Sequence, residues 1–149
     1  MLSRARRYWY GRAFQTGEFA PLFATPPDDE RIALDFETTS LDPQQAQVVG
    51  VSFAVEAGEA AYVPLAHSYM GVPAQLDRDA VLRALKPILE DPTKAKVGQH
   101  GKYDMNVLAN ATTPIAVQGL AFDTMLESYV LDSTATRHDM DSLAMKYLD

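Results

Sequence analysis

The order of apolar runs and turn signals along the chain predicts an α/β fold, a layered domain with a mixed β-sheet flanked by helices. Two adjacent apolar runs joined by a Gly-containing loop favour an antiparallel pair of strands near the start of the sheet. Beyond residue 77, segments with helical spacing alternate with short segments typical of strands. The length of 149 residues suits one domain with a hydrophobic core of its own.

The first half of the domain contains three predicted strands. The apolar run at 31–37 ends at the turn-forming letters TTSLDP. The runs at 48–56 and 60–67 are rich in β-branched and apolar residues. These three segments supply the antiparallel part of the sheet.

A helix is predicted over residues 77–90. Val81 and Leu85 repeat at helical spacing, and Asp77 can cap the first turn. Pro87 lies late in the pattern, so we expect it to kink or shorten the final turn.

Strands and helices mix in the second half. A short strand is predicted at 94–98, and the letters QHGKYDMNVLANA at 99–111 begin a helix. Residues 116–123 return as a strand or extended chain. Asp123 is well placed to cap the helix that follows, and a last helix opens near Asp139.

Composition excludes several classes of protein. Apolar residues make up 47% of the chain and charged residues 22%, as in ordinary globular domains. No run approaches the length of a transmembrane helix, so no membrane partner is expected. The absence of cysteine excludes disulfides and thiolate metal sites.

The net charge of −7 is unevenly distributed. Residues 1–20 carry four arginines against one glutamate, a balance of +3, so the remainder sums to −10. An acidic body argues against binding nucleic acid through a broad basic surface. It does not argue against a nuclease, because bound divalent cations reverse the local field of an acidic cleft.

Residues 1–30 differ from the rest of the chain. They lack clear helical or strand periodicity and end in a Pro-Pro-acidic stretch. We predict a loosely ordered N-terminal arm that belongs to no assigned domain, followed by a single domain at 31–149.

Two carboxylates interrupt the first predicted strand. Side chains two residues apart point to the same face of a strand, so Asp35 and Glu37 are neighbours while Leu34 and Phe36 pack on the other face. Two unpaired carboxylates on a buried strand repel each other and lose hydration. A hard divalent cation such as Mg²⁺ or Mn²⁺ would offset that cost. The alternative is that the strand end emerges into water and both groups are solvated.

A third carboxylate lies in the first turn of the helix at 99–111. Asp104 follows a strand and a Gly-flanked turn, a position where sites collect in layered α/β domains. The alternative is that Asp104 only complements the helix dipole.

Three stretches together resemble one known family. The letters LDFETTSLD, KVGQHGKYDMNVL and GLAFDTMLESYVLDSTATRHDMDSLA closely resemble the 3′–5′ exonuclease (proofreading) domain of bacterial DNA polymerase I, within the DEDD exonuclease superfamily. The first two correspond to the superfamily's first two exonuclease motifs, and the third is specific to the polymerase I group. The resemblance covers residues 31–149 and implies a ribonuclease H-like fold.

The resemblance implies a metal-dependent reaction. By similarity, Asp35 bridges two Mg²⁺ (or Mn²⁺) ions, Glu37 ligates one, and Asp104 helps to hold the other, which makes these three residues both catalytic and metal-binding. Two ions about 4 Å apart stabilise the attacking and leaving oxygens of an in-line displacement. The implied reaction is hydrolysis of the 3′-terminal nucleotide of single-stranded or frayed DNA, for proofreading in replication and repair.

Substrate contacts are also implied by the resemblance. Thr38 and Leu41 match positions that line the site for the terminal nucleotide, with Leu41 as an apolar wedge against the last bases. His100 stands where the polymerase I pattern usually has Asn, and Lys102 and Arg137 are candidate phosphate contacts. The alternatives are a core role for Leu41 in closing its turn, and ordinary solvated charges at Lys102 and Arg137.

The family's third motif, Tyr-x-x-x-Asp or His-x-x-x-x-Asp, is absent from these 149 residues. In the family it follows the RHDMDSLA stretch and supplies a fourth carboxylate and the group that orients the attacking water. We therefore expect a C-terminally incomplete domain, weak or inactive as this fragment, with a polymerase domain encoded downstream as a candidate partner. A cytoplasmic, nucleoid-associated location in a bacterium is expected.

Two other functions stay open from sequence. One is a non-catalytic, nucleic-acid-binding remnant that still takes a metal ion. The other is an RNA 3′ exonuclease resembling ribonuclease D in the same superfamily. The polymerase I-specific stretch favours DNA over the RNA substrate.

Overall fold

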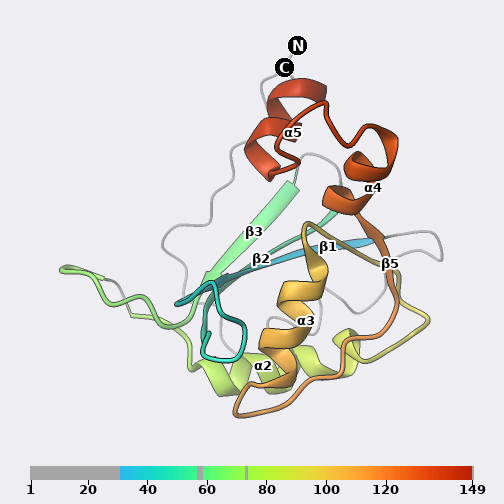
Figure 1. Cartoon of the computed structure of the whole chain (residues 1–149). Coiled ribbons are helices and arrows are strands. Elements are labelled where there is room, and N and C mark those ends of the chain that lie inside the picture. The colour runs from blue at the N-terminus through green and yellow to red at the C-terminus, as the bar shows by residue number, and fades with distance from the viewer. Residues whose placement is uncertain (1–30, 57–58, 73, 149) are drawn as a thin grey trace.

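A computed structural model of the chain describes residues 31–56, 59–72 and 74–148 (Figure 1). The predicted N-terminal arm at 1–30 lies outside the described residues. None of the helices in the described ranges is long and apolar enough to cross a membrane.

Five strands form one sheet in the order β3-β2-β1-β4-β5. The strands are β1 (Ile32–Thr38), β2 (Val48–Glu56), β3 (Glu59–Pro64), β4 (Lys96–Gly98) and β5 (Leu120–Asp123). β1 pairs with β2, and β2 with β3, in antiparallel fashion, whereas β1 with β4 and β4 with β5 are parallel. This confirms the predicted mixed sheet and places β1 at its centre.

Four helices accompany the sheet in the described residues: α2 (Arg78–Leu89), α3 (Gly101–Ala109), α4 (Thr124–Leu131) and α5 (Met140–Tyr147). The predicted helix starts are confirmed at Asp77, Asp123 and Asp139, whose side chains accept backbone N–H groups of α2, α4 and α5. Pro87 lies inside α2, and the helix ends two residues later. In Figure 1, α4 and α5 lie together, apart from α2.

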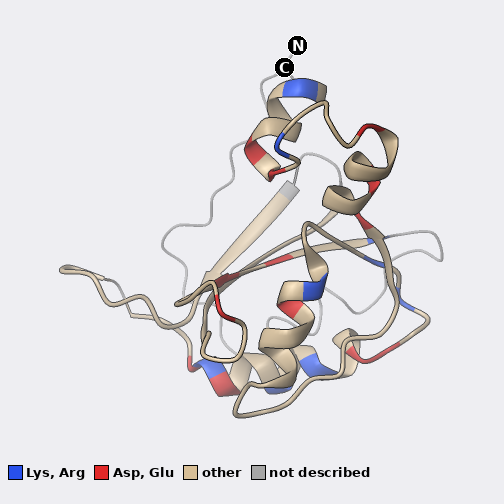
Figure 2. Cartoon of the chain, in the orientation of Figure 1, with Lys and Arg blue, Asp and Glu red and all other residues tan. Residues whose placement is uncertain are grey.

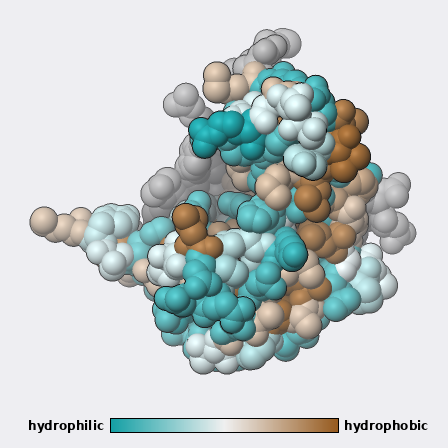
Figure 3. All heavy atoms as spheres, in the orientation of Figure 1, coloured by the Kyte–Doolittle hydropathy of each residue, from teal (hydrophilic) through white to brown (hydrophobic). Residues whose placement is uncertain are grey.

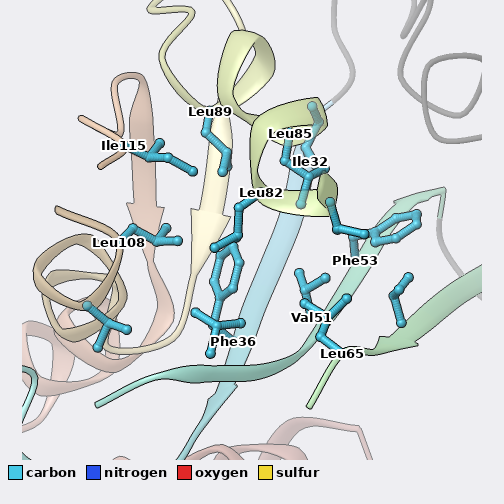
Figure 4. Packing of buried hydrophobic residues seen from close by; sticks show 14 residues of the cluster. Ile32, Phe36, Val51, Phe53, Leu65, Leu82, Leu85, Leu89, Leu108 and Ile115 are labelled. Atoms are coloured by element: carbon cyan, nitrogen blue, oxygen red, sulfur yellow. The ribbon is translucent and has the colours of Figure 1, made fainter. Parts of the chain in front are cut away.

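The core lies between α2, α3 and the central strands. Figure 4 shows Leu82 and Leu85 of α2 beside Ile32 and Phe36 of β1. These residues lie on the face of β1 opposite to the one that carries the carboxylates. The buried apolar side chains are Ile32, Phe36, Val48, Val51, Phe53, Val63, Leu65, Val81, Leu82, Leu85, Leu89, Val107, Leu108 and Ile115. Because Phe36 sits between Asp35 and Glu37 in sequence, packing of this core fixes where both carboxylates point.

The last two helices contribute little to that core. The only buried residue of α4 is Ser128, and α5 has none. Hydrophobic residues accordingly gather on the surface around α4 in Figure 3. The exposed large apolar side chains of these helices and their flanks are Leu126, Tyr129, Val130, Leu131, Met140, Met145, Tyr147 and Leu148.

Truncation of one core residue tests this packing. Leu85 is 1% exposed, so Leu85→Ala should lower the free energy of unfolding by about 2–5 kcal/mol, through lost burial and the cavity left behind. Leu41 is 97% exposed, so Leu41→Ala should change it by less than about 0.5 kcal/mol. Urea denaturation followed by circular dichroism measures both. Equal losses in the two variants would contradict the described core.

Candidate active site

Asp35 and Glu37 lie near the end of the central strand. Asp35 is half-buried, Glu37 is exposed, and Phe36 between them is buried at 7% exposure. The alternation predicted from the sequence is therefore confirmed. The β1–β2 register shifts between Glu37 and Thr38, which is a bulge of the kind that re-aims side chains beside functional sites.

Asp104 comes to the same edge of the sheet through α3. β4 runs parallel to β1, with Ala33 opposite Val97, so both strands end on the same side. The chain leaves β4 at Gly98 and begins α3 at Gly101, which puts Asp104 in the first turn of the helix. Figure 2 marks acidic residues on both β1 and α3.

The surroundings of Asp104 are mostly apolar. Its side chain lines a cavity of about 20 Å³ whose walls include Leu34, Phe36, Met105 and Leu108. A carboxylate in such a position loses hydration, and desolvation is the largest cause of its raised pKa.

The three carboxylates also act on one another. Burial, followed by the charges of Asp35, Asp123 and Glu37, raises the pKa of Asp104 to about 8. Burial and the charge of Glu37 raise the pKa of Asp35. Because like charges disfavour one another's ionisation, burial and repulsion between the carboxylates act in the same direction at this edge of the sheet.

No basic group compensates these carboxylates among the described residues. The ion pairs there join Arg78 to Asp79, Lys86 to Glu90 and Arg137 to Asp139, and none of them involves Asp35, Glu37 or Asp104. Oxygen ligands without a basic partner suit Mg²⁺ or Mn²⁺, so the donor chemistry fits these ions. In the described ranges, however, no three His, Asp or Glu side chains form a ready-made metal-binding group. The site therefore fits these ions by the type of its ligand atoms and by their negative charge.

Tyr103 joins α3 to the end of β1. Its hydroxyl lies 2.6 Å from Thr38 Oγ1 and donates to the carbonyl of Ser40. Thr38 Oγ1 in turn donates to the same carbonyl at 3.2 Å. The hydroxyl of Thr38 is thus engaged within the protein, and its contact with a nucleotide stays a prediction. From the sequence, Tyr103 was assigned only to one face of its helix. Its position next to Asp104 was the available signal that it lies near the site.

Leu41 projects from the loop after β1. It is 97% exposed, which excludes the alternative that it closes the turn as a core residue. The loop that carries it is ordered by hydrogen bonds, since Asp42 Oδ1 accepts the N–H of Gln44 at 2.9 Å and Thr39 Oγ1 accepts the N–H of Gln47 at 3.0 Å. An apolar side chain is thus presented to solvent on an ordered loop.

The three basic candidates are on the surface. His100 is exposed, with its ring 5.8 Å from the ring of Tyr103, next to Asp104. Lys102 is exposed on the first turn of α3. Arg137 has a side chain that is 90% exposed, and its Nε lies 3.4 Å from Asp139 Oδ2. Their exposure leaves each able to meet a ligand, and their phosphate contacts stay predictions.

The turn between β4 and α3 has an unusual backbone. His100 adopts φ 59°, ψ 38°, the left-handed region, and its side chain makes no capping hydrogen bond. Asn, Asp and His enter this region more readily than other non-glycine residues. The Asn of the polymerase I pattern and the His of this chain therefore share a backbone property besides their hydrogen-bonding capacity.

Comparison with known proteins assigns the chain to a family. Residues 15–149 match the family described as 3′–5′ exonuclease. DNA polymerase I of Pseudomonas aeruginosa is 84% identical over 119 residues, which are 80% of this chain and 13% of that protein. The chain belongs to the 3′–5′ exonuclease domain family of DNA polymerase I. The exonuclease domain thus spans a small part of the curated relatives it matches.

Solved structures agree on the fold of this exonuclease domain. Pol1 of M. smegmatis, in complex with a DNA primer-template and dNTP, has a TM-score of 0.69 at 23% identity, over 93% of this chain and 22% of that one. Brucella melitensis NrnC with bound Mg²⁺ has a TM-score of 0.58 at 21% identity, over 80% and 53%. These likenesses confirm the predicted nuclease fold.

The raised pKa of Asp104 predicts how stability depends on pH. Below about pH 4 the group is protonated in both the folded and the unfolded chain, and folding carries no penalty. Between pH 4 and 8 only the unfolded chain ionises, so stability falls as pH rises. Asp104→Asn should therefore raise the free energy of unfolding at pH 8 by on the order of 2–4 kcal/mol, with the gain shrinking towards pH 4.

Urea denaturation at pH 4, 6 and 8 with a metal chelator measures this difference. Asp132→Asn serves as the control, because Asp132 is exposed and the N–H and hydroxyl of Thr134 lower its pKa. That variant should show no gain at pH 8. An Asp104→Asn variant no more stable than the parent at pH 8 would contradict the described site.

Proposed function

We propose that this domain hydrolyses the 3′-terminal nucleotide of single-stranded or frayed DNA, with Mg²⁺ or Mn²⁺ as cofactor. The observation that carries the proposal is the meeting of motif carboxylates from two elements, β1 and α3, at one sheet edge without a basic partner in the described residues. Membership of the exonuclease family and 84% identity to a DNA polymerase I support it.

Asp35, Glu37 and Asp104 would hold the cations, two in the complete family site. When bound, such ions generate a hydroxide nucleophile at neutral pH and stabilise the leaving oxygen. Asp35 supplies one carboxylate on the central strand, and the bulge after Glu37 orients the carboxylate of Glu37. A bound cation would favour the ionised form of Asp104 as a ligand, against the burial and the neighbouring charges that raise its pKa.

Exposed side chains support binding of the 3′ end of a DNA strand. Leu41 offers an apolar side chain against which terminal bases pack without sequence preference. His100, Lys102 and Arg137 offer donors to phosphate oxygens. Thr38, whose hydroxyl lies 2.6 Å from that of Tyr103, would line the site for the terminal nucleotide.

We propose that the 149-residue chain trims DNA slowly by itself. Its sequence lacks the third motif, hence the fourth carboxylate and the residue that orients water. Groups of one catalytic unit are strongly non-additive, so loss of part of the unit lowers the rate by orders of magnitude.

A polymerase domain is the partner we propose for this domain within a longer protein. The relatives that it matches are about seven to eight times the length of the match, since the aligned part covers 13% of them. The exposed apolar side chains of α4 and α5 offer a surface that additional polypeptide could cover. We also propose a cytoplasmic, nucleoid-associated location, which the bacterial origin of the relatives supports.

Trimming assays test the catalytic proposal. On a 3′-tailed DNA duplex with Mn²⁺, the purified chain should release nucleoside monophosphates slowly, and chelation should stop the release. Asp35→Asn should lower the rate by about 100-fold or more, because it removes a charged ligand. Glu127→Gln, an exposed carboxylate on α4, is the matched control and should leave the rate unchanged.

Three outcomes would overturn parts of the proposal. Metal binding without any trimming would favour the non-catalytic remnant. Faster trimming of a matched RNA tail than of DNA would favour the ribonuclease D-like function. Equal rates for Asp35→Asn and the parent would mean that another component of the preparation, and not this site, hydrolyses the DNA.

A further inference from the structure

We propose that Asp123 is a positioning residue for the active site: its carboxylate holds the start of α3 and thereby sets where Asp104 stands relative to β1. This inference rests on the proposed metal-dependent function of the same site. Sequence reasoning identified Asp123 only as the cap of the helix that follows it.

The carboxylate of Asp123 accepts hydrogen bonds from two helices. Oδ1 accepts the N–H groups of Met125 at 3.1 Å and Leu126 at 3.2 Å, which caps α4. Oδ1 also accepts the N–H of His100 at 3.1 Å, and Oδ2 accepts the N–H of Gly101 at 2.8 Å. Asp123 itself is buried, with 9% exposure. One carboxylate therefore satisfies the first donors of both α3 and α4.

α3 depends on this external cap, because the residue at its own cap position provides none. His100 makes no side-chain capping bond and has a left-handed backbone. Two N–H groups aimed at one carboxylate hold that uncommon backbone in place. A Cβ at Gly101 would meet Leu120 Cδ2 at 2.8 Å, so glycine at this position lets the side chain of Leu120 in β5 pack against the start of α3.

A second set of contacts holds the same turn to the same part of the chain. Gln99 Nε2 donates to the carbonyl of His138 at 2.7 Å, and Gln99 Oε1 accepts from the hydroxyl of Thr124. His138 is buried, and its Nδ1 lies 2.9 Å from Ser128 Oγ of α4. The turn before α3 is thus anchored to α4 and the loop after it, with the carboxylate of Asp123 at the centre.

Asp104 directly follows two anchors at the start of α3. Asp123 holds residues 100 and 101, and Tyr103 binds Thr38 and Ser40 at the end of β1. Asp104 is only three residues after Gly101, within one turn of the helix. Release of the first anchor leaves the start of α3 held only by Tyr103 and by the contacts of Gln99, so the helix can tilt and carry Asp104 away from Asp35.

Other helices of the chain provide matched controls. Asp77 caps α2 through the N–H of Ala80 at 2.7 Å, and Asp139 caps α5 through the N–H of Ser142 at 2.8 Å. Each caps a single helix that does not carry Asp104. Replacement of Asp77 or Asp139 removes a cap of the same chemistry without touching the start of α3.

The experiment compares Asp123→Ala and Asp123→Asn with Asp77→Ala in the full 149-residue chain. Mn²⁺ affinity by calorimetry should fall about 10-fold or more in Asp123→Ala, as for loss of a group that orients a metal ligand, and stay within about twofold in Asp77→Ala. In metal-free protein, the amide of Gly101 should exchange faster in both Asp123 variants and that of His100 in Asp123→Ala, and the NMR signals of Asp104 should shift. A merely structural cap would not produce that difference between the Asp123 variants and Asp77→Ala.

Each result bears on the inference separately from the proposed function. If the parent binds Mn²⁺ and both Asp123 variants bind it equally well, the inference is wrong although the metal site stands. If the parent binds no Mn²⁺, the proposed function fails, and unshifted Asp104 signals in the variants would independently refute positioning. Should Asp123→Ala not fold, Asp123→Asn decides, because it keeps one oxygen to accept the N–H groups of α4 while its amide nitrogen cannot accept that of Gly101.

Discussion

Repulsion between carboxylates that the fold does not allow to separate is the constraint on which this site depends. Asp35 and Glu37 flank Phe36, and Phe36 is packed in the core with Ile32 and the leucines of α2. The strand cannot rotate to relieve the repulsion without withdrawing Phe36 from that core. Asp104 is held at the same edge by α3, in apolar surroundings that intensify the interaction. The core thus keeps an unfavourable charge arrangement that a divalent cation turns into a favourable one.

Two side chains in the second half of the chain, Tyr103 and Asp123, support this arrangement. Tyr103 fixes α3 to the loop after β1, and Asp123 fixes the preceding turn to α4. Neither residue needs to touch a cation to matter, since each determines where a metal-binding carboxylate can stand. α4 and α5 bury little of their own surface, so in the described residues their clearest structural contribution is this anchoring of the turn.

Local patterns predicted the elements well because their causes are local. Alternation along β1 placed Asp35 and Glu37 on one face, and Asp77, Asp123 and Asp139 were recognised as helix starts from side-chain chemistry alone. Features that depend on contacts between distant parts of the chain could not be predicted from the sequence. The parallel pairing of β1 with β4, the bulge after Glu37 and the contacts of Tyr103 depend on residues far apart in sequence. The exposure of Leu126, Tyr129 and Val130 on α4 could not be read from the sequence either, since periodicity does not say what covers a helix.

Paramagnetic broadening by Mn²⁺ tests most directly whether the carboxylates of β1 and α3 form one cation site. In a titration of the ¹⁵N-labelled chain, the amide signals of Asp35, Glu37 and Asp104 should broaden together at the lowest Mn²⁺ concentrations, and excess Mg²⁺ should restore them. Broadening that begins instead at the exposed carboxylates of Asp132 or Asp139, or that Mg²⁺ does not reverse, would contradict a shared site at this edge of the sheet.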